Sequence, residues 1–518
     1  MTIDLARNGL PSAEHGGVRI HSPYDPRREA RRFLDTALAD GDAPRAVVII
    51  GAGLGYVDEA AAERWPNANI LAIHLSRELH EGRISSGGDD AAPRVRRWHP
   101  ECGVDLASFL SEALTESAMR GLRVLVWPPA AAAMPVEAEE ANRSLAEIVR
   151  RNTGSISATA AFGRSWIRNA VRNFVDLDRI ALPAAVERPV VLAASGPSLE
   201  FALPLLSSNR HRFRLWALPS AMPALKAASL APDLIFATDS GFWARLHMRS
   251  FPRDVPIAMP LSAAPLPPHT GTPLLIRQGI PGESRLLRSP EWPLLPVPAR
   301  GTVAATAVEA WAVSARGPLL LVGLDLCWRD LRSHARPHAF DGWIASRTDR
   351  RNPPLNESWN RAVVQAPIRS GALRTGPALE TYADWFRGLD GKDRIVRFRS
   401  PDDPDDPAPI PGIPMRGPEV FREWAPPGES GGYRTIKAPL DRRRRHAAVV
   451  RLLNDWKERL DGRQAGEGDD DFDELLYVLD PGGALNLAGA PEEARKAIAD
   501  DHRARVRRTV EELRAAYA

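Results

Sequence analysis

The sequence has little cysteine, little lysine and no long apolar run. Its two cysteines, Cys102 and Cys327, provide neither a disulfide framework nor a CxxC metal pattern, which is typical of a reducing compartment. Only five of the 68 Lys+Arg residues are lysine, a skew that a GC-rich genome explains. No apolar stretch approaches the ~20 residues that span a bilayer, and no secretory leader is apparent. We therefore expect a soluble, cytoplasmic protein without a membrane span.

The excess of positive charge is also small. The 68 Lys+Arg and 65 Asp+Glu residues give a formal net charge of +3, which argues against a dedicated nucleic-acid binder. At 518 residues and 44% hydrophobic composition, the chain is long enough for about three domains with cores of their own. Its 47 prolines are too scattered for a collagen-like or single low-complexity chain.

Several catalytic signatures are missing from the sequence. It contains no G-x-x-x-x-G-K-[ST] phosphate loop, no G-x-S-x-G nucleophile turn and no H-E-x-x-H zinc helix. His334 and His338 have the four-residue spacing of metal ligands on a helix, but Pro337 between them would break that helix. A zinc site of this kind is therefore not expected, and whether the protein needs a metal is unknown from the sequence.

The first pattern that is present is that of an α/β fold. Residues 46–50 are a short apolar run typical of a strand buried on both faces, and the Gly-rich loop 51–55 follows at once. Residues 69–73 and 122–127 repeat the strand pattern, which predicts a Rossmann-like parallel-sheet domain over residues 1–150. The Gly-rich loop fits a phosphate cradle or a tight turn with positive φ, and the second strand ends without the acidic residue that a dinucleotide ribose needs.

A second α/β pattern occupies residues 151–400. Apolar strand candidates at 190–194, 213–217, 233–237 and 319–322 alternate with helical stretches, which predicts a central parallel sheet. Such a sheet places ligands at the carboxyl ends of its strands. Polar residues that directly follow these strands are therefore the candidates for a binding site.

The composition changes again after residue 400. We expect a Pro-rich linker over residues 401–438 and a helical C-terminal domain over residues 439–518. The run Arg442–Arg445 fits either a solvated helix face or a dock for an acidic partner. The helical tail can serve for dimerisation or for binding of an acceptor, so a homo-oligomer stays open.

The loop after the first central strand reads Ser195, Gly196, Pro197 and Ser198. Glycine permits close approach of a ligand to the backbone, and proline fixes φ at the start of a helix. Ser198 can cap that helix or donate a hydrogen bond to a phosphate. The four residues are thus either a phosphate-binding loop or an ordinary helix start.

Three titratable residues are candidates for catalysis. Asp239 and Asp325 each follow a strand, where a carboxylate can hold a ribose, a metal ion or an acceptor hydroxyl, or can cap a helix. His334 fits a general acid or base, or a solvated loop histidine. We predict these three as the catalytic residues.

Four segments of the sequence form a pattern when they are taken in order. They are AASGPSLE (193–200), LKAASLAPDLIFATDS (225–240), GTVAATAVEAWAVSARGPLLLVGLDLCWRDLRSHA (301–335) and ALRTGPALETYADWF (372–386). Together they resemble the family of 6-hydroxymethylpterin diphosphokinase MptE-like proteins and motility-associated factor (Maf) glycosyltransferases. IIGAGLGY at 49–56 is similar to a loop that precedes this domain in bacterial Maf proteins. The resemblance covers about residues 45–420.

This resemblance implies a nucleotide-binding, sialyltransferase-like core and a transferase activity. In the Maf proteins, a nonulosonic acid of the pseudaminic or legionaminic type passes from a CMP-sugar to Ser/Thr of flagellin. The flanking domains favour that function, with a nucleotide-sugar donor, a flagellin-type acceptor and no obligatory cofactor. The alternatives are transfer of diphosphate from ATP with Mg²⁺ to 6-hydroxymethylpterin, and a non-catalytic, motility-linked scaffold that binds flagellin.

The resemblance also assigns roles to residues. In the mechanism that we expect for this function, the amides of residues 196–199 and the Ser198 hydroxyl would bind the donor phosphate, with Gly301 and Thr302 as a second polar loop. Arg329 and Arg332 are candidates for clamping an anion. The sequence departs from the family at Leu324, where Gln is usual, and at Thr302, which replaces Ser and keeps the hydroxyl.

Overall fold

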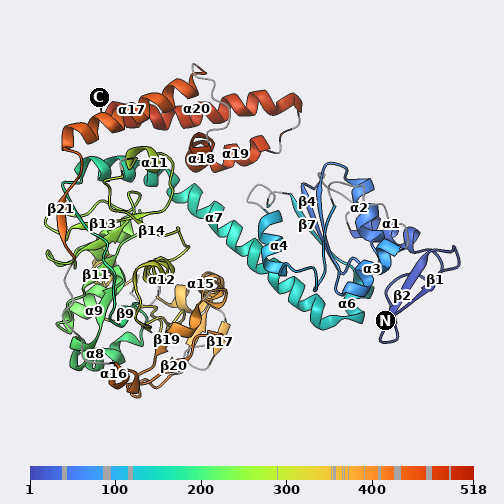
Figure 1. Ribbon diagram of the computed structural model, residues 1–518, viewed down its shortest axis with the longest axis horizontal. Helices are drawn as coiled ribbons and strands as arrows, with labels where there is room; N and C mark the ends of the chain where they lie inside the picture. The colour runs from blue at the N-terminus through green and yellow to red at the C-terminus, as the bar shows by residue number, and fades with distance from the viewer. Residues whose placement is uncertain are drawn as a thin grey trace. The chain divides into compact units, whose positions relative to one another are not determined.

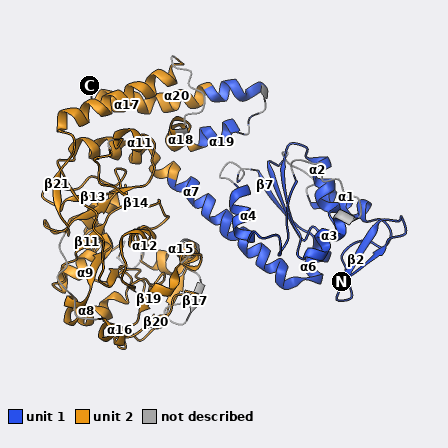
Figure 2. Cartoon of the chain, viewed as in Figure 1, with its two compact units in different colours: residues 1–158, 482–499 blue, residues 159–481, 500–518 orange. Residues whose placement is uncertain are grey.

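The protein forms two compact units in the computed structural model (Figures 1 and 2). Unit 1 contains residues 1–158 and 482–499, and unit 2 contains residues 159–481 and 500–518. The structure describes residues 1–37, 44–85, 95–114, 119, 121–288, 290–351, 353, 358–364, 366, 368–370, 373–389, 391–405, 410–424, 433–462, 470–488, 490 and 492–517.

Unit 1 is built on a parallel sheet of four strands in the order β6-β5-β4-β7. Strand β4 (Ala46–Ile50) is buried along its whole length, because its β-branched side chains meet helices on both faces. The other strands are β5 (Asn69–Ile73), β6 (Val95–Trp98) and β7 (Leu122–Val126). The predicted parallel sheet is therefore confirmed.

Helices and a small antiparallel sheet complete the N-terminal part of unit 1. The antiparallel sheet consists of β1 (Thr2–Leu5), β2 (Pro11–His15) and β3 (Val18–Arg19). The helices are α1 (Pro26–Ala37), α2 (Tyr56–Arg64), α3 (Arg77–Ser85), α4 (Leu106–Ala113) and α6 (Pro128–Ala133).

A single long helix, α7 (Pro135–Asp176), contributes to the cores of both units. In the sequence, an Ala- and Glu-rich segment at 136–151 and a separate apolar stripe at 162–177 are each typical of a helix, and the structure joins them in one. Leu145 and Ile148 lie in the core of unit 1, whereas Ile167 and Phe174 lie in that of unit 2.

Unit 2 is built on a parallel sheet of nine strands in the order β14-β13-β12-β11-β10-β9-β15-β19-β20. It confirms the predicted central α/β sheet. The strands are β9 (Val190–Ala193), β10 (Arg214–Ala217), β11 (Leu234–Phe236), β12 (Ile257–Met259), β13 (Pro273–Arg277), β14 (Leu295–Pro296), β15 (Leu319–Val322), β19 (Ile395–Phe398) and β20 (Met415–Arg416).

Both faces of this sheet are covered by separate hydrophobic clusters, as a parallel sheet requires. Successive residues of β9 belong to different clusters, Val191 to one and Leu192 to the other. The connecting helices are α8 (Leu199–Ser208), α9 (Met222–Ala227), α10 (Phe242–Met248), α11 (Glu283–Leu286), α12 (Val303–Ser314), α15 (Pro377–Arg387) and α16 (Glu419–Glu423).

The sequence of residues 327–375 is polar and typical of a loop, but the structure has short helices and strands in this region. A small antiparallel sheet joins β16 (Trp328–Arg329), β18 (Leu373–Thr375) and β17 (Ile368–Ser370), and helix α13 (Asp341–Ser346) lies between β16 and β17 in the chain. These elements are too short to show a clear sequence period, so the loop expectation was wrong here.

The described part of the expected linker 401–438 packs into unit 2. Strand β20 extends the main sheet, and β21 (Thr435–Lys437) pairs with β8 (Arg179–Ala181). Asp403 is 5% exposed and forms an ion pair within the core, at 2.7 Å from Arg329. The proline- and aspartate-rich composition thus gave no indication of the strand pairing and the buried ion pair in this segment. Residues 406–409 and 425–432 lie outside the described ones.

The C-terminal helices are α17 (Arg442–Leu460), α18 (Asp470–Leu479), α19 (Pro481–Ala488) and α20 (Glu492–Tyr517). Val449, Leu475 and Val510 share a hydrophobic cluster with α7. The helical character predicted for the tail is present. The domain boundaries at 150, 400 and 438 stay predictions about independent folding, which the division into compact units does not test.

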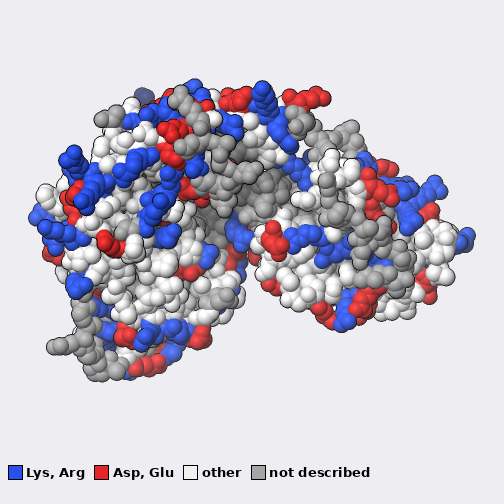
Figure 3. Space-filling view, turned by 45° about the horizontal axis from the view of Figure 1, so that its top comes forward, with Lys and Arg blue, Asp and Glu red and all other residues white. Residues whose placement is uncertain are grey.

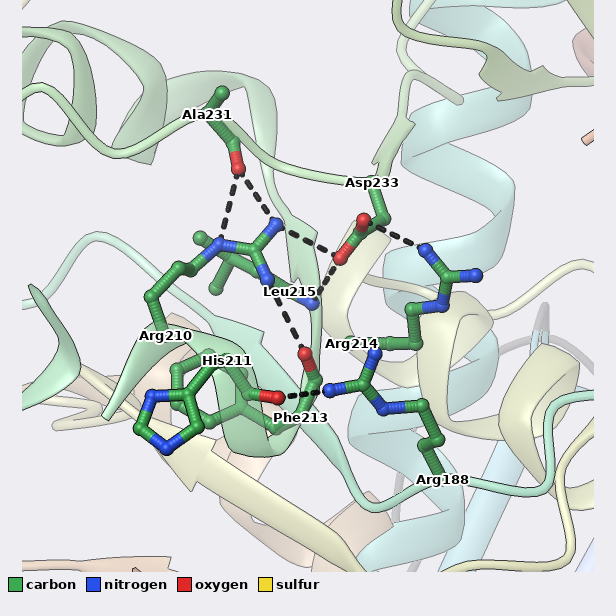
Figure 4. Close-up of polar contacts among 8 residues, drawn as sticks. All are labelled: Arg188, Arg210, His211, Phe213, Arg214, Leu215, Ala231 and Asp233. Carbon is green, nitrogen blue, oxygen red and sulfur yellow. Dashed lines mark hydrogen bonds and ion pairs between the residues drawn. The ribbon is translucent and has the colours of Figure 1, made fainter. Parts of the chain in front are cut away.

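Arginines brace the amino-terminal edge of the large sheet, as Figure 4 shows. Asp233 accepts from Arg210 and Arg214, at 2.9 Å each, and from the Leu215 amide at 2.7 Å. Arg188 donates to the carbonyl oxygen of His211 nearby. On the face drawn in Figure 3, basic and acidic side chains are interspersed, in keeping with the balanced composition.

Candidate functional site at the carboxyl edge of the large sheet

The strand order of unit 2 reverses between β9 and β15. From β9 the chain builds outward through β10 to β14, and then returns to place β15 on the other side of β9. In open α/β sheets, the crevice outside the carboxyl ends of two such strands is the usual ligand site. The loops that begin there are 194–198 and 323–325, which contain the residues singled out from the sequence.

The structure brings Ser198 and Asp325 together across this reversal. One carboxylate oxygen of Asp325 accepts from the Ser198 amide at 2.7 Å, and the other accepts from the Ser198 hydroxyl. Gly196 allows this approach, because a Cβ there would lie 2.5 Å from Cγ of Asp325 and 2.6 Å from the Gly323 carbonyl oxygen. Burial raises the pKa of Asp325, while the Ser198 hydrogen bonds oppose that shift.

The amides expected to bind a donor phosphate already have protein acceptors. The Gly196 amide donates to Gly323 at 2.7 Å, the Ser198 amide to Asp325, and the Leu199 amide to Gly196 at 3.0 Å. Pro197 has no amide hydrogen. A cradle of these backbone amides is therefore not present. Ser195, Gly196, Pro197 and Ser198 form a turn that Asp325 holds closed, and their role toward a ligand stays a prediction.

The two arginines proposed as anion clamps are also engaged within the protein. Arg329 is 4% exposed and lies between Asp403 at 2.7 Å and Asp405 at 2.8 Å. Arg332 forms an ion pair with Glu200. These guanidinium groups neutralise carboxylates of the protein itself, and their role as an anion clamp stays a prediction.

Asp239 lies at the same sheet edge, in the loop after β11. Strand β11 is two strands from β9, or about 10 Å along the sheet. The residue is accessible to solvent, yet the protein packed around its carboxyl group removes water and raises its pKa. Its negative charge contributes to the raised pKa of Tyr382 on α15. Tyr382 was missed as a site residue, although the 372–386 motif contains it.

His334 belongs to a loop that is tied to the turn at 195–198. The amide of Ala335 donates to the Ser195 carbonyl at 2.7 Å, and the amide of Arg336 donates to Glu200 at 2.7 Å. Burial lowers the pKa of His334 to about 4. At neutral pH the imidazole is therefore uncharged, so it is not the protonated form that would serve as a general acid.

Two further histidines pack beside His334. The ring centroids of His334 and His338 are 4.2 Å apart, and His338 is 5.2 Å from His247 on α10. Burial lowers the pKa of His338 to about 3 and that of His247 to about 4. Within the described ranges, no group of three or more His, Cys, Asp or Glu residues is placed to hold a metal ion.

Gly301 and Thr302 lie at the start of α12, again at the carboxyl edge. The Thr302 hydroxyl oxygen accepts from the Ala305 amide at 3.0 Å, so this residue caps the helix. Gly301 is exposed, with open space around it. Leu324, which stands where the family has Gln, joins the apolar cluster beneath α12.

The Gly-rich loop of unit 1 is filled by side chains of the protein. A Cβ on Gly53 would overlap the ring of His21, and one on Gly55 would overlap Arg83. The Leu54 amide donates to Nε2 of His21 at 2.8 Å. Gly53 and Gly55 have φ of 59° and 93°. These contacts favour the tight turn over the phosphate cradle.

Comparison with known protein families locates the resemblance in unit 2. Residues 164–331 match the family described as 6-hydroxymethylpterin diphosphokinase MptE-like. This central segment is therefore similar to MptE-like proteins. It contains the turn at 195–198, Asp239, Asp325 and the start of α12. The family predicted from the sequence motifs is thereby confirmed for this segment.

A solved structure shares the fold of the whole chain. The Maf glycosyltransferase from Magnetospirillum magneticum AMB-1 superposes with a TM-score of 0.56 at 14% sequence identity, over 100% of this chain and 91% of that one. The predicted α/β fold class is therefore confirmed. At this identity the likeness concerns the fold.

Two curated relatives were also found. An uncharacterized protein from Treponema pallidum (strain Nichols) is 27% identical over 317 residues, which are 60% of this chain and 65% of that protein. A trans-aconitate 2-methyltransferase from Rhodococcus jostii (strain RHA1) is 37% identical over 67 residues, 13% of this chain and 26% of the enzyme. The chain thus covers less than two thirds of the length of either relative.

No helix among the described residues is long and apolar enough to cross a membrane.

Proposed function

We propose that this protein is a glycosyltransferase that transfers a nonulosonic acid from a CMP-sugar to Ser/Thr hydroxyls of a flagellin-type acceptor in the cytoplasm. The fold of a Maf glycosyltransferase and the MptE-like domain support a transferase in general. The observation that carries the proposal is the accessible Asp239 carboxyl at the same sheet edge as the Ser198–Asp325 contact. This edge is where an open α/β sheet binds its substrates.

In the proposed reaction, Asp239 acts as the general base. The oxygen of the acceptor hydroxyl forms a bond to the anomeric carbon of the donor sugar, while the bond from that carbon to the phosphate oxygen of CMP breaks. The hydroxyl proton passes to the Asp239 carboxylate, and the electron pair of the broken bond stays on CMP. A carboxylate with a raised pKa is a stronger base than an ordinary one.

Asp325 and Ser198 support this chemistry in a different way. Both carboxylate oxygens of Asp325 accept from Ser198, so Asp325 fixes the turn after β9. His334, uncharged at neutral pH, adds a polar group without adding charge beside an anionic donor. Of the three titratable candidates, Asp239 is therefore the one we assign to proton transfer.

The test is to incubate the full-length protein and flagellin with CMP-nonulosonates, and separately to supply ATP with 6-hydroxymethylpterin. Release of CMP with a gain in flagellin mass is expected. Asp239→Asn should lower this transfer at least about 100-fold, because a general base contributes about 10²–10⁴-fold. The control is Glu187→Gln, an exposed carboxylate before β9, which should keep wild-type activity.

The pH profile provides a second readout of the same step. Activity should fall as the pH drops through the raised pKa of Asp239, since a protonated carboxyl cannot take the proton. Full activity of Asp239→Asn, with the wild-type pH profile, would exclude this residue as the base.

The second candidate function is diphosphate transfer from ATP to 6-hydroxymethylpterin, which the match of residues 164–331 favours. Formation of AMP with the pterin, and no CMP release, would support it. Stable flagellin binding without turnover of either substrate would instead indicate a scaffold.

A further inference from the structure

The loop that contains Asp239 is hydrogen-bonded to the long helix α7. The side-chain amide nitrogen of Asn169 donates to the carbonyl oxygens of Ser240 and Ser262, at 3.1 Å each. Ser240 directly follows Asp239, and Ser262 belongs to the loop after β12. One buried amide thus joins two loops at the carboxyl edge of the sheet.

One helical turn further along α7, Asn173 makes an equivalent pair of hydrogen bonds. Its amide nitrogen donates to the carbonyl oxygens of Leu261 and Ala263, at 2.8 Å each. Asn169 is 5% exposed and Asn173 is 8% exposed. The two side chains share chemistry, burial and helix face, but Asn173 contacts only the loop after β12.

Two other contacts restrict the backbone around Asp239. Its carbonyl oxygen accepts from the Ala264 amide at 2.9 Å. A Cβ on Gly241 would lie 3.3 Å from the ring of Phe162 on α7, so the chain approaches the helix closely here. With the Asn169 bond to Ser240, three successive residues, Asp239 to Gly241, are held at and directly after the Asp239 side chain.

We propose that Asn169 is a positioning residue that directs the Asp239 carboxylate toward the acceptor hydroxyl, whereas Asn173 only braces the loop at 261–263. The proposal rests on the proposed function for the role of Asp239 in transfer. A small displacement of a reacting group lowers the rate steeply, because proton transfer requires the base within hydrogen-bond reach. Asn169 acts through the loop and does not touch the substrate.

The kinetic test compares Asn169→Ala with Asn173→Ala in the full-length protein. Each variant loses two buried hydrogen bonds, so similar losses of stability are expected. Asn169→Ala should lower kcat at least about tenfold with the donor KM within about twofold, and should shift the acidic limb of the pH profile. Asn173→Ala should keep kcat and that limb within about twofold of wild type.

Equal losses of kcat in the two variants would overturn the proposal, since they would indicate a general effect of weakening α7. A wild-type kcat for Asn169→Ala would overturn it as well. An unchanged acidic limb in Asn169→Ala, despite a lower kcat, would also contradict an effect through Asp239.

Hydrogen exchange separates this proposal from the proposed function, because it requires no substrate. Asn169→Ala should speed amide exchange over residues 237–243, and Asn173→Ala over residues 261–264 only. If the wild-type protein transfers no sugar, the proposed function is wrong. The exchange pattern still tests whether Asn169 holds the Asp239 loop in place. Unchanged exchange at 237–243 in Asn169→Ala would overturn the positioning role, whatever the reaction is.

Discussion

Two histidines in unit 1 are buried against the Gly-rich turn, and burial lowers the pKa of each to about 3. His21 accepts from the Leu54 amide, and Nδ1 of His74 lies 2.8 Å from the Gly53 carbonyl oxygen. The unfolded chain protonates histidine below about pH 6.5, whereas the folded chain does so only near pH 3. Their contribution to stability is therefore complete above pH 6.5 and is lost as the pH falls from there to 3.

A buried carboxyl group has the opposite effect on the pH dependence of stability from the two histidines. Burial raises the pKa of Asp58 to about 6, although its ion pair with Arg97 at 2.9 Å opposes the shift. Folded unit 1 therefore binds this proton more readily than the unfolded chain does between about pH 6 and 4. The slope of the free energy of unfolding against pH is the sum of the contributions of all these groups. The contribution of one histidine is therefore best isolated by a substitution.

We predict that His74→Asn makes unit 1 less sensitive to acid. Asparagine keeps an amide donor for the Gly53 carbonyl and cannot titrate. Between pH 6.5 and 4.5, the free energy of unfolding of the variant should fall less steeply than that of wild type, by about 1.4 kcal/mol per pH unit. Urea unfolding, followed by hydrogen exchange of residues 46–75, measures the free energy of unfolding of both proteins at each pH. The difference between variant and wild type at pH 7.5 is subtracted from the values at lower pH. Parallel pH dependences for the two proteins would contradict the prediction.

The residue-level site was only partly predictable. Ser198 and Asp325 were both identified because each follows an apolar strand, but nothing in a linear pattern shows that two residues 127 positions apart form a pair. Tyr382 and Asn169 were missed for a related reason. Their partners lie on other elements, and an asparagine between apolar helix positions has no pattern of its own.

At the scale of single elements, the start of α12 allows capping and ligand binding to be separated. Thr302→Ala should lower the free energy of unfolding by about 1 kcal/mol, since the Ala305 amide loses its acceptor. Thr302→Ser and Thr302→Asp keep a capping oxygen and should retain most of that stability. Thermal unfolding of the three variants measures the cap.

The same variants test whether Thr302 lies at the donor site. We expect Thr302→Ser to keep the KM for the CMP-sugar, and Thr302→Asp to raise it at least about tenfold because like charges repel. A wild-type KM for Thr302→Asp would remove Thr302 from the donor site and leave it as a helix cap.

Elements with a strong period were predicted well, and those whose partners are distant were not. Strand Ala46–Ile50 has the predicted bounds, because its apolar content marks it locally. Strand β20 was missed because two residues carry no period and follow a proline-rich run. It exists because its register partner, Arg397, lies on a buried strand of the sheet.

At the scale of the whole molecule, the arginine content has a structural use in addition to its compositional origin. Arg445 is 1% exposed and donates to the Val175 carbonyl at 3.1 Å and to Asp178 at 2.9 Å. Arg397 is 3% exposed and donates to the Leu324 carbonyl at 2.6 Å. Several of the 63 arginines therefore satisfy buried backbone and carboxylate acceptors with a planar, forked guanidinium group, whose geometry the single ammonium of a lysine could not match.

The C-terminal helices contribute to the same hydrophobic cluster as α7, and Gly163 lies at a close contact between α7 and α18. A Cβ at Gly163 on α7 would overlap the carbonyl group of Val478 on α18. Gly163→Ala should therefore push the two helices apart and lower the free energy of unfolding of unit 2 by about 1–3 kcal/mol. The control lies on the same helix: Gly154 has open space around its Cβ position, so Gly154→Ala should be neutral or stabilise by up to about 1 kcal/mol.

The displacement of α7 in Gly163→Ala should also affect the candidate site at the carboxyl edge of the sheet. Asn169 lies less than two turns from Gly163 on α7 and is hydrogen-bonded to Ser240 in the Asp239 loop. Hydrogen exchange of Gly163→Ala should rise in residues 470–479 and also in residues 237–243, and transfer should fall with the second change. If exchange rose only in residues 470–479 while transfer stayed at the wild-type rate, α18 would stabilise unit 2 without supporting the Asp239 loop. Equal stability of the Gly163→Ala and Gly154→Ala variants would show that the α7–α18 contact is looser than the backbone geometry requires.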